Sequence, residues 1–364
     1  MSNILEGAVL LPTGVQRGGA SIYRLRKNGL TNEYFIVSGE GTRHLMASPE
    51  VVGYESYLAM TPSTSAALDY FVRDGKPDNV EILTILRGGL NYPLEESCYR
   101  SGIRVGNMNF VSCERIIEDG IITGLEIKYE KLHIAKDAIL MIGDIIASGD
   151  TLQLCLTRVF DRIRRRGGSV RKVIFFTIGG TKAITRMEAM TEAVRKFWPD
   201  FEGFSCIFYE GIFTVYEDKG VTGVNIPDID FGWRGGIVAP EFRHNAFSFY
   251  KYALLEKCII YDGGARRYEI PAHCDEVIEY WEDLLEASGR SDFDEFIREK
   301  IGYGGEISYE SWLELNHYTA LGDLRKLYEL EQRYIRMLRT ESLEDICRAR
   351  LREFRTAMQN YINK

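Results

Sequence analysis

The stretch Gly143–Thr151, GDIIASGDT, constrains the fold of this chain more than any other segment. It follows the apolar run Ala138–Ile142 and precedes Leu152–Leu156, where apolar residues continue at helical spacing. A buried strand, a turn of small residues and a helix start are typical of α/β proteins. Backbone N–H groups in such a turn, backed by the helix N-terminus, can hold a phosphate group. No Gly-Lys-Ser/Thr follows the turn, so it is not a Walker A loop.

The alternation of strand, loop and helix signals extends through the middle of the chain. Apolar strands are expected at 80–86, 137–142 and 170–178, with a helix at 151–166. Near-continuous apolar strands alternating with helices predict an α/β fold: a doubly wound, mostly parallel sheet with helices on both faces. Ligands in such sheets bind at the carboxyl ends of the strands, where both Arg87–Gly89 and Asp144–Thr151 fall.

The chain has 364 residues, which is enough for more than one domain. Short strand signals in residues 1–60 predict a small N-terminal β subdomain. A helix is expected to begin at Thr61, with its hydroxyl as the cap and Pro62 in the first turn. Beyond Arg243 the apolar residues take helical spacing. We therefore predict an α/β core at 61–243 and a helical C-terminal domain at 244–364.

Composition limits the class of partner. The net charge of −8 argues against a general nucleic-acid binder, whose footprint is a basic face. No apolar stretch is long enough for a membrane helix and no targeting signal opens the chain, so we expect a cytoplasmic protein without membrane contact. The seven cysteines are scattered and form no CxxC pair, and we expect them to be reduced thiols.

In combination, these segments resemble the type I phosphoribosyltransferases, enzymes that use phosphoribosyl pyrophosphate (PRPP). Gly143–Thr151 resembles their PRPP loop, Ile85–Leu90 their pyrophosphate loop, and Asn109–Ser112 the start of their mobile catalytic loop. Gly223–Asp228 is similar to the segment that borders the base in the 6-oxopurine branch, which includes hypoxanthine-guanine phosphoribosyltransferase. The resemblance covers roughly residues 82–230 and implies the phosphoribosyltransferase-like α/β fold.

Carried over residue by residue, the resemblance implies roles for the loops. Asp144 would accept hydrogen bonds from the ribose hydroxyls, and Arg87 with the amides of Gly88 and Gly89 would bind the pyrophosphate leaving group. Asp144, Arg87, Ser112 and Lys182 are the implied catalytic residues. The 5-phosphate of PRPP would bind to the loop residues Ala147, Ser148, Gly149, Asp150 and Thr151.

The resemblance also implies Mg²⁺ as a cofactor, held by PRPP with Asp144 and Asp228. Phe231 and Trp233 could stack on the base, or could equally be core residues. Asp228 after Ile-Pro could equally form a turn, and Lys182 could be a solvated lysine. The polar stretch Ser112–Thr123 is expected to be a lid over the site, with an ordinary surface hairpin as the alternative.

Two positions depart from the family pattern. Gly143 stands where many relatives have the first of two adjacent acids, and Ala147 stands where the 6-oxopurine enzymes carry an aspartate that handles the proton of the base. Alanine can do no acid–base chemistry. We expect a Mg²⁺-dependent phosphoribosyltransferase acting on a nucleobase or similar nitrogen heterocycle. The alternative is a non-catalytic PRPP- or nucleotide-binding regulatory protein. The helical tail is expected to form an oligomer interface in a homo-oligomer or to cover the site.

Overall fold

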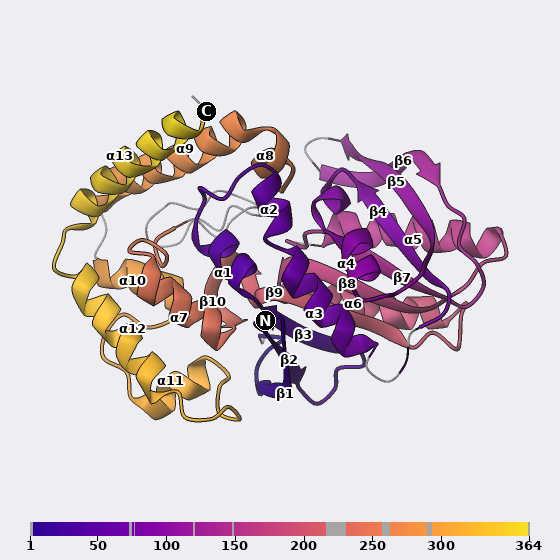
Figure 1. Ribbon diagram of the computed structural model, residues 1–364, viewed down its shortest axis with the longest axis horizontal. Coiled ribbons are helices and arrows are strands. Elements are labelled where there is room, and N and C mark those ends of the chain that lie inside the picture. Colours follow the sequence, from indigo (N-terminus) through magenta and orange to yellow (C-terminus); the bar gives the residue numbers. More distant parts are fainter. Residues whose placement is uncertain are drawn as a thin grey trace.

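The structure is a computed structural model that describes residues 3–72, 75, 77–118, 121–147, 149–215, 231–256, 263–289 and 293–362. One sheet runs through it (Figure 1), with the strand order β1-β2-β3-β9-β8-β7-β4-β5-β6 and with β10 paired to β9. Its central strands β3, β9, β8, β7, β4 and β5 pair with one another in parallel. The predicted fold class, a mostly parallel α/β sheet with N-terminal strands and C-terminal helices, is confirmed.

The strands carry the apolar runs identified in the sequence. All six residues of β7 are buried, as expected for a strand covered by helices on both faces. The strand bounds are β1 Val9–Arg17, β2 Ala20–Arg26, β3 Glu33–Ser38, β4 Val80–Leu86, β5 Val105–Glu118, β6 Ile121–Lys131, β7 Ala138–Gly143, β8 Val170–Gly180, β9 Gly203–Val215 and β10 Phe231–Val238.

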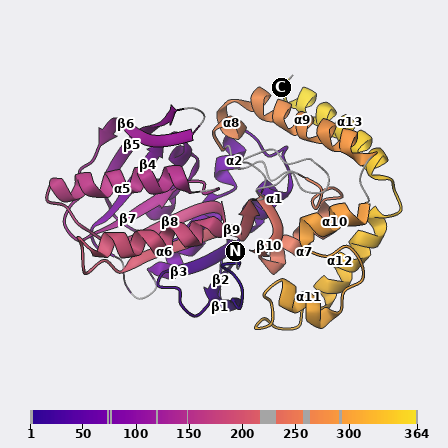
Figure 2. The same ribbon diagram turned by 180° about the vertical axis from the view of Figure 1, so that it is seen from behind.

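Helices cover both faces of the sheet. Helices α3 (Thr61–Phe71) and α4 (Leu94–Arg100) pack on the face seen in Figure 1. Helices α5 (Asp150–Arg165) and α6 (Thr181–Arg195) pack on the opposite face, seen in Figure 2. The expected capping role of Thr61 is wrong, because Met60 is the N-cap residue of α3 and there is no side-chain capping hydrogen bond.

The N-terminal strands extend the main sheet. β3 pairs in parallel with β9, so β1 and β2 continue the same sheet as an antiparallel edge. Two short helices, α1 (Glu40–Ala47) and α2 (Tyr54–Leu58), follow β3 in a region where no helix was predicted. The division of the chain at residues 60 and 243 stays a prediction.

The C-terminal helices lie on the far side of β9 and β10 from the α5 and α6 pair (Figure 1). Helices α9 and α13 run side by side along the outer rim, as Figures 1 and 2 both show. No helix among the described residues is long and apolar enough to cross a membrane. The bounds are α7 Pro240–Phe249, α8 Gly263–Tyr268, α9 Ile270–Ser288, α10 Phe293–Ile301, α11 Tyr309–Leu315, α12 Arg325–Leu338 and α13 Leu343–Ile362.

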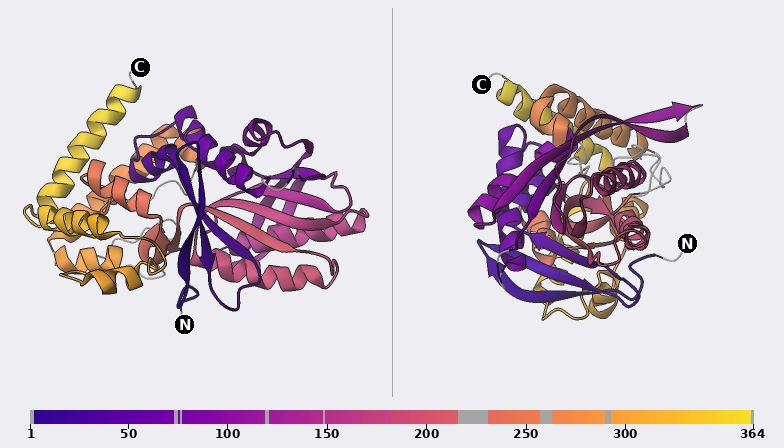
Figure 3. Two further views of the ribbon diagram at one scale, coloured as in Figure 1. Left: turned by 60° about the horizontal axis from the view of Figure 1, so that its bottom comes forward. Right: turned by 90° about the vertical axis from the view of Figure 1, so that its right-hand side faces the viewer.

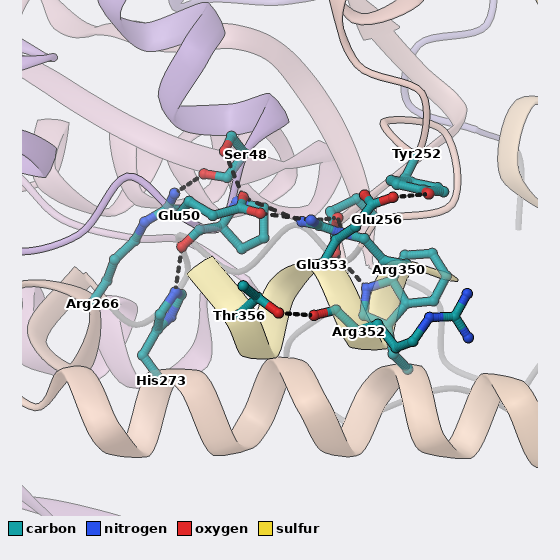
Figure 4. Close-up of polar contacts among 12 residues, drawn as sticks. Ser48, Glu50, Tyr252, Glu256, Arg266, His273, Arg350, Arg352, Glu353 and Thr356 are labelled. Carbon is teal, nitrogen blue, oxygen red and sulfur yellow. Dashed lines mark hydrogen bonds and ion pairs between the residues drawn. The ribbon is translucent and has the colours of Figure 1, made fainter. Parts of the chain in front are cut away.

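A buried polar junction joins these helices to the segment between α1 and α2 (Figure 4). Arg350 on α13 pairs with Glu50 at 2.6 Å and with Glu256 at 2.7 Å. Arg266 on α8 donates to the carbonyl of Val51 at 2.5 Å. Charged groups buried this deeply need such partners, so the junction fixes how the C-terminal helices sit on the α/β core.

Candidate functional site

Asp144 lies at the carboxyl end of β7, in the middle of the sheet. Its amide donates to the carbonyl of Phe176 at 3.1 Å, which holds the residue against the neighbouring strand β8. The amide of Ile145 donates to Asp144 Oδ1 at 2.9 Å. Burial raises the pKa of the Asp144 carboxyl to about 7, against the smaller opposing effect of that hydrogen bond. The hydrogen bond therefore fixes the orientation of the carboxyl group. A cation bound nearby would lower its pKa again and favour the charged form.

The loop Arg87–Gly89 lies directly against Asp144. A Cβ atom added at Gly88 would be 2.6 Å from Asp144 Oδ1, and one added at Gly89 would be 3.1 Å from the carbonyl oxygen of Gly143. Only glycine leaves room for this approach. The two loops that the sequence placed at the carboxyl ends of different strands are thus in contact, since β4 and β7 pair in parallel.

The start of the loop after Asp144 is held to β8 at Ile146. Ile146 forms a bridge with Gly179, and the amide of Gly180 donates to the carbonyl of Ile146 at 3.1 Å. Gly149, at φ +79°, is the N-cap residue of α5, so the amides of the first turn face the loop. Asp150 and Thr151 lie in that first turn, Ala147 precedes it, and Ser148 lies outside the described residues.

Arg186 on α6 joins this loop and was missed by the sequence reasoning. Its guanidinium pairs with the carboxylate of Asp150, and its Cγ would be 3.0 Å from a Cβ atom at Gly149. Lys182, an implied catalytic residue, stands one turn earlier on the same helix. Residues four apart lie on the same face of a helix, so the spacing between Lys182 and Arg186 could have indicated that Arg186 lies near the same loop.

Ser112 lies on β5 beside Leu86, the residue that precedes Arg87. From there β5 and β6 form an antiparallel hairpin whose pairing runs from Phe110 and Lys131 to Glu118 and Ile121. The purple hairpin extends away from the body of the sheet in Figure 3 (right). The proposed lid therefore has the form of the alternative, a surface hairpin, and its closing over the site stays a prediction.

Tyr92 explains why residue 143 is glycine. The Tyr92 side chain packs on Gly143, where an added Cβ would be 2.4 Å from Tyr92 Cβ. The buried Tyr92 hydroxyl accepts a hydrogen bond from the amide of Ile178 at 3.2 Å. The position that carries a first acid in many type I phosphoribosyltransferases is therefore filled by an aromatic side chain from the segment after η1 (Gly88–Asn91).

The implied base-binding residues make contacts within the protein. Phe231 is 5% exposed, and its ring lies 5.9 Å from that of Phe213. The ring of Trp233 lies 5.4 Å from Phe242 and 5.7 Å from Phe247, both on α7. Base binding by these residues stays a prediction. The implied metal residue Asp228 lies outside the described residues.

Glu210 is a second buried carboxyl group at the same edge of the sheet, and nothing in the sequence marked it. It interrupts β9 at φ +64° and accepts hydrogen bonds from the Gly39 amide at 2.9 Å and from the hydroxyls of Ser38 and Thr42. Burial raises the pKa of Glu210 to about 7. These bonds join the start of α1 to β9 and fix the turn after β3.

The C-terminal helical part contacts the segment Arg87–Leu90. Arg267 at the end of α8 donates to the carbonyl of Leu90 at 2.7 Å, and Glu269 lies 3.6 Å from Arg87. Because the Arg87 side chain is 81% exposed, this ion pair is open to exchange with a bound anion. Whether the tail covers the candidate site or forms an oligomer interface stays a prediction.

No protein-family profile matches the chain, and no curated protein matches its sequence. Solved structures similar to part of it include the AQ2163 protein from Aquifex aeolicus, at 16% identity and TM-score 0.36, over 50% of this chain and 91% of that one. A Staphylococcus aureus hypoxanthine phosphoribosyltransferase is similar at 14% identity and TM-score 0.27, over 44% and 77%. A Trypanosoma cruzi hypoxanthine phosphoribosyltransferase is similar at 11% identity and TM-score 0.28, over 36% and 68%. At such identities the likeness concerns the fold alone.

Proposed function

We propose that this protein is a PRPP-dependent phosphoribosyltransferase that transfers the 5-phosphoribosyl group to a nucleobase or similar nitrogen heterocycle and releases pyrophosphate. The contact between Gly88 and Asp144 carries the proposal, because it joins the implied pyrophosphate and ribose sites at one edge of the sheet. The glycine-capped start of α5 follows Asp144 in the chain and supplies the amides for the 5-phosphate.

In this proposal each group binds a particular part of PRPP. The amides of Gly88 and Gly89 and the guanidinium of Arg87 bind the leaving pyrophosphate, on which negative charge grows as the bond to the anomeric carbon breaks. Asp144 accepts from the ribose hydroxyls and orients the sugar. Arg186, already beside Gly149, adds a cation to the phosphate loop.

The donor set fits a magnesium ion that arrives with PRPP. The described residues contain no group of three or more histidine, cysteine or acidic side chains that could hold a metal ion. Mg²⁺ commonly binds through substrate phosphates, waters and one or two carboxylates, and Asp144 supplies one carboxylate here. When bound, the ion would offset the charge of the pyrophosphate. Asp144 and the oxygens of PRPP would hold it.

One observation favours a second candidate, a non-catalytic PRPP- or nucleotide-binding regulatory protein. The Tyr92 side chain closes the position of the first acid, and Ala147 offers no proton acceptor to a base. Both changes leave the phosphate and pyrophosphate loops in place. Binding without turnover is the property that distinguishes this candidate from the enzyme.

Pyrophosphate release tests the proposal. The purified full-length chain is incubated with PRPP, Mg²⁺ and a panel of purines, pyrimidines and pyridines, and PRPP binding is measured by calorimetry. We expect turnover with one class of acceptor and its loss, with weaker PRPP binding, in Asp144→Asn. Asp137→Asn is the matched control, because Asp137 stands at the opposite end of β7, is 60% exposed, and has a φ of 60° that asparagine accepts. PRPP binding without turnover would favour the regulatory candidate, and no binding would exclude both.

A further inference from the structure

Two cysteines from different elements meet beside the candidate site. Cys113 lies on β5, one residue after Ser112, where the hairpin leaves the sheet, and Cys155 lies on α5. Their sulfur atoms are 3.1 Å apart. Cys155 is 1% exposed, whereas Cys113 is only partly buried. The pair therefore combines one thiol that a small reagent can reach with one that it cannot.

The two thiols have different chemical characters. The two sulfur atoms share a hydrogen bond, which lowers the pKa of the Cys113 thiol. The hydrogen bond with Cys113, together with burial, raises the pKa of the Cys155 thiol. The thiolate is the reactive form of cysteine, so Cys113 is the nucleophile of the pair. Cys155 is the thiol that can react with Cys113 once Cys113 is oxidised.

We propose that Cys113 and Cys155 are a thiol-oxidation site that forms a reversible disulfide when the protein meets a peroxide. The Cys113 thiolate attacks one oxygen of hydrogen peroxide, and proton uptake by the departing hydroxide gives a sulfenic acid and water. The sulfur of Cys155 then attacks the sulfenic sulfur, forming the S–S bond and releasing a second water with the Cys155 proton. The dithiol loses two electrons and the peroxide gains them.

The geometry needs only a small movement. A disulfide has an S–S length of about 2.05 Å, so the sulfurs must approach by roughly 1 Å from their present separation. The register of β5 and β6 shifts between Ser112 and Cys113, one of the two places where the described pairing of this hairpin is irregular, so Cys113 does not lie in a regular stretch of the ladder. A third element, β4, ends next to Ser112 and leads into the pyrophosphate loop.

A regulatory consequence follows if the proposed function holds. The disulfide would bind the base of the hairpin to α5, whose first turn follows the phosphate loop. A hairpin fixed in this way could not move over bound PRPP. The oxidised protein is therefore expected to lose pyrophosphate release and to regain it on reduction.

The thiol chemistry is tested first, without PRPP. The full-length chain is treated with hydrogen peroxide, alkylated, digested and analysed by mass spectrometry. We expect two fewer alkylated thiols and a linked peptide containing Cys113 and Cys155, both reversed by dithiothreitol. Cys155→Ser should stop at a sulfenic acid on Cys113 that dimedone traps, and Cys113→Ser should form no such adduct. Cys274→Ser, which alters a buried cysteine on α9, should leave the disulfide unchanged.

The outcomes separate the two proposals. A linked peptide other than that of Cys113 with Cys155, or oxidation of the double variant Cys113→Ser/Cys155→Ser at the wild-type rate, would overturn the thiol site. A correct disulfide in a protein that releases no pyrophosphate even when reduced would support the thiol site and count against the proposed function. A correct disulfide with unchanged pyrophosphate release would overturn only the regulatory consequence.

Discussion

The side chain of Tyr92 occupies the space that any side chain at residue 143 would need. An added Cβ at Gly143 would be 2.4 Å from Tyr92 Cβ and 2.5 Å from Cγ. These are the atoms nearest the tyrosine backbone, so rotation of the ring cannot relieve the contact. Glycine at 143 and the segment through Tyr92 therefore form one packing unit beneath Asp144.

An acidic side chain introduced at residue 143 should destabilise the protein. We expect Gly143→Asp to lower the free energy of unfolding by about 3 kcal/mol or more, because overpacking a dense core forces backbone shifts. Urea denaturation measures this. In a double-mutant cycle, Gly143→Ala should cost clearly less in a Tyr92→Gly background than in the wild type. Equal costs in both backgrounds would contradict the packing explanation.

Glu210 should make stability depend on pH. Its folded pKa of about 7 lies above the value of 4.5 expected when unfolded. Its contribution is fully present below pH 4.5, falls as the unfolded carboxyl ionises, and is lost once pH rises through 7. The difference in unfolding free energy between wild type and Glu210→Gln should change by about 3 kcal/mol over this range, in the direction of a less stable wild type. Urea denaturation of the wild type and Glu210→Gln across this pH range measures the difference, and a difference that does not change with pH would contradict the prediction.

Arg350 should be essential to the junction of Figure 4. Its replacement by methionine leaves Glu50 and Glu256 without their cation, and breaking a buried ion pair in this way costs about 3 kcal/mol or more. Arg348→Met on the same helix removes an exposed pair with Glu344 and should change stability by less than about 0.5 kcal/mol. Guanidinium denaturation measures the free energy of unfolding of both variants. Equal losses in the two variants would contradict the prediction.

Arg186 should support anion binding at the phosphate loop. Arg186→Ala removes a cation and leaves the Asp150 charge uncompensated at the start of α5, so we expect PRPP affinity to fall roughly tenfold. Asp150→Asn in the same chain should recover part of the loss. Calorimetry at low and high salt provides the measurement, and the effect should shrink at high salt. Unchanged affinity would remove Arg186 from the site.

The sequence alone predicted the alternation of strands and helices in the middle of the chain and the placement of the two loops, but not helices α1 and α2. Apolar runs at 80–86 and 138–142 predict strands from neighbouring residues, and parallel pairing then places Arg87 and Asp144 at the same edge. Both inferences use local periodicity and one general rule of α/β sheets. Both predictions could therefore be made without knowing how the side chains pack.

Only the tertiary structure decided which side chains meet. The pairing of β3 with β9, the packing of Tyr92 on Gly143, the ion pair of Arg186 with Asp150 and the approach of Cys113 to Cys155 all join segments that are far apart along the chain. Such contacts depend on how strands and helices pack in three dimensions. The spacing of residues along the sequence does not predict them. The periodicity of apolar residues predicts secondary structure, whereas the chemistry of a site depends on the distances between side chains that tertiary packing sets.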